Sequence, residues 1–168
     1  VTADLESTNY SLGGLIGISA GNITTASVTG DVISTNGKTG GLIGEMQNGT
    51  ITGATVLGDV TTTRSDQWSE KVGGLIGTGT GTLTDVMFTG DVSSSFGSYV
   101  GGIAGEFTGD VSNARADGNV STGGDGTLDV TGRNGSYVGG LVGQLRGNHT
   151  VSDSSAISGM ITGYGFAV

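Results

Sequence analysis

The chain has 168 residues and a formal net charge of −9 at pH 7; 36 residues are glycine, and none is proline or cysteine. The lack of cysteine excludes disulfides and thiolate metal sites, and the lack of proline and of a Gly-X-Y period excludes a collagen triple helix. The acidic balance argues against nucleic acid as a partner, and no stretch approaches the roughly 18 consecutive apolar residues that predict insertion into a membrane. Because 34% of the residues are hydrophobic, with regularly spaced Val, Ile and Leu, we expect residues 1–168 to form a single domain with a core.

A Gly-Gly-aliphatic-aliphatic-Gly motif, in one copy with Ala at the second aliphatic position, recurs along the chain. Its five copies begin at Gly13, Gly40, Gly73, Gly101 and Gly139, which are 27, 33, 28 and 38 residues apart. Each copy is followed by a small or polar turn, an aliphatic residue with Thr or Ser after it, and a Gly-Asp-Val segment that becomes degenerate in the last copies. Self-similarity at this spacing is typical of solenoid proteins, so each copy is expected to begin one coil.

Aligning the copies places like residues in columns. Five columns are Leu15, Leu42, Leu75, Ile103, Leu141; Ile23, Ile51, Leu83, Val111, Val151; Ala26, Ala54, Val86, Ala114, Ser155; Val28, Val56, Phe88, Ala116, Ile157; and Val32, Val60, Val92, Val120, Ile161. Ala26 and Val28 alternate around polar Ser27, which is the period of a β-strand, and no segment of helical length has a period of 3.6 residues. The sequence therefore predicts an all-β fold: a parallel β-solenoid, or β-helix, of about five coils with three short strands per coil, standing about 24 Å tall.

A further apolar column directly follows the Leu15 column and consists of Ile16, Ile43, Ile76, Ala104 and Val142. Strict alternation would turn one of these two columns outward, where it would form a packing surface for another chain. A bend at the flanking glycines would instead turn both columns inward. The sequence leaves these two arrangements open.

Most of the length variation between coils falls between the Gly-Asp-Val segment and the next Gly-Gly. The inserts are Ile33–Thr39, Thr61–Val72, Ser93–Val100 and Ser121–Val138. Insertions at one point of a repeat predict loops on one side of a solenoid. This side is expected to hold Trp68, Arg64, Lys71 and Arg133, and its two longest loops are candidates for contacting a glycan or a protein.

Three segments resemble GLUG-motif repeats: GSYVGGIAGEF at Gly97–Phe107, GSYVGGLVGQL at Gly135–Leu145 and GTLTDVMFTGDVSS at Gly81–Ser94. The resemblance extends over nearly the whole chain. It implies a repetitive extracellular surface protein of bacteria or archaea, often adhesive, and provides no catalytic residues to carry over.

Six of the eight asparagines lie in Asn-x-Ser/Thr sequons, whereas the content of Ser and Thr, 42 of 168 residues, predicts about two by chance. They are Asn9, Asn22, Asn48, Asn119, Asn134 and Asn148. The motif marks surface asparagines open to N-glycosylation. The alternative is that asparagine prefers turns and is followed by the Thr-rich strands.

The sequence offers little for catalysis or metal binding. Asp31, Asp59 and Asp91 stack on successive coils and could bind a cation such as calcium, or each could accept a hydrogen bond from the backbone of its own turn. Gly123–Asp129 misses the calcium-binding nonapeptide because Leu128 stands where Asp is needed. His149 is the single histidine, so a catalytic triad would depend on it alone. We therefore expect no enzyme activity and no cofactor.

Neither end of the chain resembles a capping element. Val1–Leu12 reads as part of a loop before a Gly-Gly motif, and Ile161–Val168 stops where another motif would begin. Open solenoid ends invite further strands. We expect either a segment of a longer adhesin that binds glycan or protein, or an extracellular, glycosylated structural subunit that polymerises through its ends into a cell-surface filament; the second is the preferred hypothesis.

Overall fold

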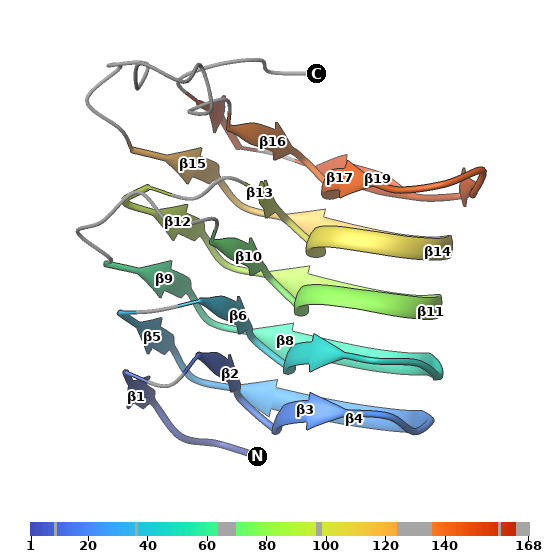
Figure 1. Ribbon diagram of the computed structural model, residues 1–168, viewed down its shortest axis with the longest axis horizontal. Helices are drawn as coiled ribbons and strands as arrows, with labels where there is room; N and C mark the ends of the chain where they lie inside the picture. The colour runs from blue at the N-terminus through green and yellow to red at the C-terminus, as the bar shows by residue number, and fades with distance from the viewer. Residues whose placement is uncertain are drawn as a thin grey trace.

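The structure is a computed structural model in which the chain forms a stack of β-coils, with its first strand at one end and its last described strand at the other (Figure 1). It describes residues 1–8, 10–35, 37–63, 70–96, 99–123, 136–157 and 159–163. These residues form twenty strands and no helix, and every strand pair among them is parallel. No helix in the described ranges therefore has the length and hydropathy needed to cross a membrane.

The strands belong to three sheets that run along the stack. The five-stranded sheet contains β2 (Ser11–Gly13), β6 (Lys38–Gly40), β10 (Lys71–Gly73), β13 (Tyr99–Gly101) and β16 (Tyr137–Gly139). The six-stranded sheet contains β1 (Leu5–Ser7), β5 (Val32–Ser34), β9 (Val60–Thr62), β12 (Val92–Ser94), β15 (Val120–Thr122) and β20 (Ile161–Thr162). The nine-stranded sheet contains β3 (Ile16–Ser19), β4 (Ile23–Thr29), β7 (Ile43–Met46), β8 (Thr50–Leu57), β11 (Ile76–Thr89), β14 (Ala104–Asp117), β17 (Val142–Leu145), β18 (Val151–Ser152) and β19 (Ser155–Ile157).

Each coil visits the five-stranded, the nine-stranded and the six-stranded sheet in that order. The five passages through the five-stranded sheet delimit four complete turns, followed by the rest of a fifth coil. In the third and fourth coils the nine-stranded sheet is crossed by one uninterrupted strand of 14 residues, β11 or β14. The predicted all-β parallel solenoid is confirmed. Three strands per coil are found in the third and fourth coils, whereas the first two coils have four strands because their passage through the nine-stranded sheet is divided in two.

Strand pairing confirms most of the predicted columns. Val32, Val60, Val92, Val120 and Ile161 are paired in sequence, as are Ile23, Ile51, Leu83, Val111 and Val151. The fifth coil differs from the prediction: Ala116 pairs with Ala156 instead of Ile157, and the Ser154 hydroxyl, instead of Ser155, meets the Ala114 N–H.

The shift in the fifth coil has a backbone cause. In the fourth coil, Asn113 lies two residues after Val111 and has a left-handed φ of 48°. In the fifth coil, Asp153 lies two residues after Val151 and has the same conformation, with a φ of 49°, so no extra residue can be inserted between Val151 and Ser154. The extra residue of this coil therefore lies between Ile157 and Gly159. As a consequence, Ile157 is exposed.

The open question about the two adjacent apolar columns is settled by burial. Leu42 and Ile43, and likewise Leu75 and Ile76, are fully buried, so both columns point inward. The chain makes a tight hairpin at each Gly-Gly motif, so the strand of the five-stranded sheet and the strand that follows it lie directly against each other. This hairpin replaces the strict alternation of a continuous strand.

The hairpin depends on the first and last glycines of the motif, which face each other across it. We call this contact the glycine seam: Gly13, Gly40, Gly73, Gly101, Gly139 on one side and Gly17, Gly44, Gly77, Gly105, Gly143 on the other. A Cβ atom on Gly105 would lie 2.6 Å from the Val72 nitrogen and 2.7 Å from the Gly77 and Tyr99 oxygens. All three are backbone atoms, so no side-chain rotation could relieve the overlap. The second glycine of the motif packs on the long strand instead; at Gly41 a Cβ would lie 2.6 Å from Val56 Cγ1.

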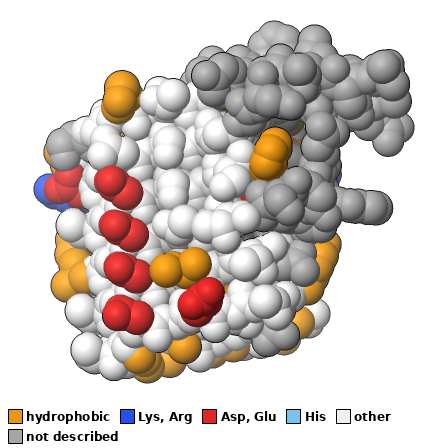
Figure 2. Space-filling model, turned by 90° about the vertical axis from the view of Figure 1, so that its left-hand side faces the viewer, with side chains coloured by type: hydrophobic (Ala, Val, Ile, Leu, Met, Phe, Trp, Pro, Cys, Tyr) orange, Lys and Arg blue, Asp and Glu red, His pale blue; other side chains and the backbone are white. Residues whose placement is uncertain are grey.

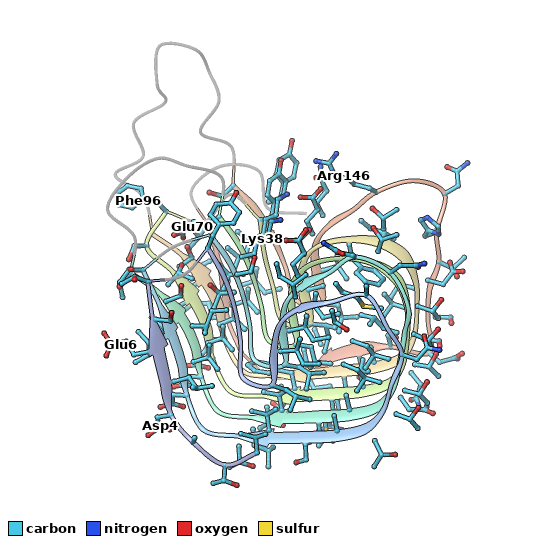
Figure 3. The ribbon with its side chains drawn as sticks, turned by 60° about the horizontal axis from the view of Figure 1, so that its bottom comes forward. Asp4, Glu6, Lys38, Glu70, Phe96 and Arg146 are labelled. Carbon is cyan, nitrogen blue, oxygen red and sulfur yellow. The ribbon has the colours of Figure 1, made fainter. Side chains whose placement is uncertain are left out.

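The seam divides the interior into two cores, which are visible when the stack is tilted toward its axis (Figure 3). One core lies between the six-stranded and five-stranded sheets and contains buried Val60, Val72 and Val92. The other is enclosed by the nine-stranded sheet and contains buried Leu83 and Phe107.

The predicted loops connect the six-stranded to the five-stranded sheet, but they are shorter than expected, since their first and last residues belong to strands. Lys71 accordingly opens β10, whereas Arg64, Trp68 and Arg133 lie outside the described residues.

The glycine seam predicts an asymmetric response to Gly→Ala substitution. We expect Gly105→Ala to lower the free energy of unfolding by about 3 kcal/mol or more, since the new methyl group meets only backbone. Gly21→Ala is the matched control, because a Cβ there has no atom within 4 Å. Urea denaturation followed by circular dichroism measures both, and equal stability of the two variants would contradict a role for the seam.

Candidate functional site

A column of acidic side chains runs along the start of the six-stranded sheet (Figure 2). The Oδ1 atoms of Asp31 and Asp59 each accept a hydrogen bond at 2.8 Å from the backbone N–H of the next aspartate in the column, Asp59 and Asp91 respectively. The column begins at Asp4, which accepts the N–H of Asp31 at 3.0 Å, and ends at Asn119, whose N–H donates to Asp91 at 2.7 Å. We call these five residues the Asp column. Each member links two coils.

The glycine before each aspartate makes this link possible. Gly58 has a φ of 139°, and a Cβ on it would lie 2.7 Å from the Gly30 carbonyl carbon of the coil below. Each aspartate accepts its hydrogen bond from the backbone of the neighbouring coil. The alternative in which it accepts one from its own turn is therefore wrong. In the described ranges no group of three or more His, Asp or Glu side chains is arranged to hold a metal ion. Gly123–Asp129, the segment that misses the calcium-binding nonapeptide pattern, lies almost entirely outside those ranges.

Four of the six predicted glycosylation sites can be located. Asn22, Asn48 and Asn148 are exposed and lie at the turns that precede β4, β8 and β18 respectively. Asn119 is also exposed, but its Nδ2 donates to both carboxylate oxygens of Asp91, at 3.0 and 3.1 Å. Asn9 and Asn134 lie outside the described residues.

A second feature, which sequence reasoning missed, lies at the open end of the glycine-seam hairpin, where the two strands of the hairpin diverge. Ser11, Lys38, Lys71, Tyr99 and Tyr137 are paired in sequence along the five-stranded sheet, and we call them the Lys–Tyr column. The Tyr99 and Tyr137 rings are stacked, with centroids 5.2 Å apart and planes 5° from parallel. The Lys38 ammonium lies 5.5 Å from the centre of the Tyr10 ring, and that of Lys71 lies 5.9 Å from the Tyr99 ring.

Carboxylates of the nine-stranded sheet face the Lys–Tyr column across the hairpin. Lys38 Nζ lies 2.6 Å from Glu45, and Lys71 Nζ lies 2.5 Å from Glu106 of the next coil, which also pairs with Arg146. Lys38 and Arg146 lie on the same side of the molecule (Figure 3). No regular spacing marks this cluster, because Lys38 and Glu45 meet only once the hairpin has folded.

An open hollow of about 280 Å³ lies beside this cluster. It forms because the third coil has Thr78, Gly79 and Thr80 at the level where the second coil has Glu45, Met46 and Gln47. The smaller side chains leave a depression with Glu45 and Glu106 on its two sides. The hollow itself is lined by carboxylates and hydroxyls, and the ion pairs of Glu45 and Glu106 connect it to the Lys–Tyr column.

Glu70 is a fully buried carboxylate at the start of β10. Its Oε2 accepts hydrogen bonds from the Thr62 and Ser94 hydroxyls, both at 2.7 Å, while its Oε1 has no hydrogen-bond partner among the residues that the structure describes. It thereby joins the two middle members of a column of buried hydroxyls formed by Ser34, Thr62, Ser94 and Thr122. This arrangement ties the loop before β10 to two neighbouring coils.

His149, the single histidine, pairs with Asp110, not with a nucleophile. The backbone N–H and the hydroxyl of Thr150 donate to Asp110 Oδ1 at 2.9 and 3.2 Å, and these bonds hold the pKa of Asp110 below its ordinary value. His149 Nδ1, 3.6 Å from the same oxygen, lowers the pKa further, against a small opposing effect of burial. Because the folded-state pKa is lowered, the attachment of the fifth coil is favoured above the ordinary carboxyl pKa and weakens as the pH falls through the lowered value.

Comparison with known proteins adds no assignment. No protein-family model, curated protein or solved structure matches the chain significantly. The functional interpretation therefore depends on the coils, the two columns and the ends of the stack.

The Asp column predicts a clear difference between two substitutions at its centre. Asp59→Asn and Asp59→Ala both remove the charge, but only asparagine keeps an acceptor for the Asp91 N–H. We expect Asp59→Ala to be about 1 kcal/mol less stable than Asp59→Asn in urea denaturation. We also expect Asp59→Asn to be at least as stable as the unmodified chain, because it relieves repulsion between stacked carboxylates. A calcium-dependent stabilisation that Asp59→Asn abolishes would instead support a cation site.

Proposed function

We propose that this protein is an extracellular structural β-solenoid whose copies associate end to end into a filament. The observation that carries the proposal is the burial difference between the ends and the middle of the stack. Leu15 in the first coil is 40% exposed, whereas the equivalent Leu42 is fully buried one coil higher. At the other end Val151 is 43% exposed, whereas Val111 one coil lower is fully buried.

The strand edges support the same proposal. Among the described strands, β2, β3 and β4 are outermost in their sheets at one end, and β16, β17, β18 and β19 are outermost at the other. Edge strands carry unpaired backbone donors and acceptors that accept another strand. A head-to-tail contact of this kind does not close on itself and therefore grows as a filament.

The surface location is proposed from the sequence and from exposure. The GLUG-like motifs, the acidic composition and the exposed sequons at Asn22, Asn48 and Asn148 all favour a secreted, glycosylated surface protein. Sugars at these turns would project from the side of the stack and leave its ends free.

Native material tests this proposal by negative-stain electron microscopy with intact mass spectrometry. We expect filaments and a subunit mass above 16.5 kDa. Leu15→Arg, which buries a charge at the joint, should raise the concentration needed for assembly about tenfold or more, whereas Leu57→Arg should not. Leu57 is a matched control because it is also 40% exposed but lies on the second coil, away from the ends. A monodisperse monomer at millimolar concentration, or an equal effect of both variants, would contradict the proposal.

The Lys–Tyr column favours a second candidate, a glycan-binding module. The sequence suggested the long loops as the binding surface, but the stacked tyrosines and the hollow beside Glu45 and Glu106 provide a better-defined one. Sugar rings pack on aromatic faces, and carboxylates and hydroxyls accept and donate hydrogen bonds to sugar hydroxyls. Since both lysines are already paired with glutamates, the surface favours a neutral oligosaccharide.

Titration calorimetry with cellohexaose, maltohexaose and chitohexaose tests this candidate. If one of them binds, Tyr137→Ala should weaken the affinity about tenfold through loss of ring contact, whereas Tyr137→Phe should change it little. Absence of binding by all three sugars at millimolar concentration would count against the module.

A further inference from the structure

The four sequons that the structure describes differ in the hydrogen bonds of their asparagine side chains. Asn22, Asn48, Asn119 and Asn148 are all exposed, so exposure alone would make them equal candidates for N-glycosylation. The atom that would carry the sugar is the side-chain Nδ2. The bonds that Nδ2 already makes therefore decide which of these asparagines can react in the folded chain.

Asn119 is held on both sides of its amide. Its Nδ2 donates to Oδ1 and Oδ2 of Asp91, at 3.0 and 3.1 Å, and its Oδ1 accepts the Met160 N–H at 2.8 Å. Its backbone N–H also donates to Asp91 Oδ1, at 2.7 Å. The residue thus links the third, fourth and fifth coils, and its side chain cannot turn outward without losing the bonds to Asp91 and Met160.

The other three asparagines keep Nδ2 available. Asn48 and Asn148 make no hydrogen bond to another described residue. Asn22 Oδ1 accepts the Thr50 N–H at 2.9 Å, but no described residue accepts a hydrogen bond from Asn22 Nδ2. Each of these side chains can therefore present Nδ2 to a transferase without giving up a bond that Nδ2 makes.

We infer that the proposed glycosylation, on which this step rests, is selective among these four sites. Asn22, Asn48 and Asn148 accept a glycan in the folded chain, whereas Asn119 is a structural member of the Asp column and stays unmodified. Among the described sequons, sugars are then confined to the turns before β4, β8 and β18. The opposite end of the long strand, where the Asp column runs from coil to coil, carries none of them (Figure 2).

The chemistry of sugar transfer explains the selectivity. Asparagine Nδ2 forms a bond to the anomeric carbon of a nucleotide-activated sugar, while the bond from that carbon to the diphosphate oxygen breaks. The nucleotide leaves with the bonding electron pair, and one Nδ2 proton passes to a base of the transferase. The Nδ2 lone pair is delocalised into the amide carbonyl, so the transferase has to reorient the amide before Nδ2 can react. At Asn119 this reorientation breaks hydrogen bonds to a carboxylate, which contribute more than bonds between neutral groups.

Glucosylation of the purified, folded chain tests the selectivity. The probe is a soluble N-glycosyltransferase that transfers glucose from UDP-glucose to sequon asparagines, with the modified sites mapped by mass spectrometry. The reference is the tryptic peptide Ala116–Arg133, which contains the sequon of Asn119 and no other. We expect glucose on Asn22, Asn48 and Asn148 of the folded chain. Asn119 should be modified about tenfold or more slowly in the folded chain than in the peptide.

Two substitutions test whether Asp91 is the cause. Asp91→Ala removes the acceptor of Asn119 Nδ2 and should raise the rate at Asn119 toward that of the peptide. Asp85→Ala is the matched control, because Asp85 is also exposed and accepts an asparagine Nδ2, that of Asn113, which lies outside any sequon. Circular dichroism shows whether both variants keep the fold, and the comparison of the unmodified chain with the peptide does not depend on either variant.

Three results would overturn the selectivity. They are equal rates at Asn119 and Asn48 in the folded chain, an equal gain at Asn119 from both substitutions, and a peptide as unreactive as the folded chain, which would place the cause in the sequence around Asn119. Glycan on Asn119 in native material would overturn it as well. Native material with no glycan at any site would instead overturn the glycosylation in the proposed function, and the rates measured on the folded chain would still decide the difference between the sites.

Discussion

The close approach of two backbones at the glycine seam is the constraint on which the rest of the structure depends. At Gly105 and its equivalents, two strands of one coil pack without side chains between them. This contact lets the chain reverse within the Gly-Gly motif, so that residues such as Leu75 and Ile76, adjacent in sequence, are both buried. It also creates two narrow cores instead of one wide one. Small residues suffice to fill such cores, which explains how a chain with only 5% aromatic residues excludes water.

The seam also determines where the charged groups can meet. The hairpin has a closed end, where the second glycine of the motif packs on the long strand, and an open end, where its two strands diverge. Lys38 and Glu45 are paired at the open end, and Lys71 reaches Glu106 because its own coil has Thr78 at the corresponding position. The mixed aromatic and charged surface is therefore a direct consequence of the backbone path, with its chemistry set by the few residues that vary from coil to coil.

The repeat made the columns predictable, because register can be read from an alignment without knowing the path of the chain. Val32, Val60, Val92 and Val120 needed no further information. The hairpin was not predictable from periodicity, since Leu42 and Ile43 are equally consistent with an extended strand that buries one of them. The acceptor role of Asp59 was ambiguous because its own turn and the next coil offer chemically identical N–H groups. β1 was missed because Ala3 stands where the other copies have glycine. The predicted register of the fifth coil was wrong because the backbone conformation at Asp153, not the type of side chain, sets that register.

Charge placement would give the proposed end-to-end association a direction. Part of the net charge of −9 is carried by Asp4, Asp31, Asp59 and Asp91 of the Asp column, which are exposed on the side of the stack and repeat from coil to coil. Two stacks that approach side by side bring like charges together along their whole length, which opposes lateral contact. At the ends, by contrast, Leu15 and Val151 are exposed next to unpaired strand edges, so that burial and hydrogen bonding both favour axial contact. Acidic sides with apolar ends would favour growth of the proposed filament along one axis. The Asp column would contribute to this direction, since each carboxylate would repel a second stack at its side while it holds the next coil in register.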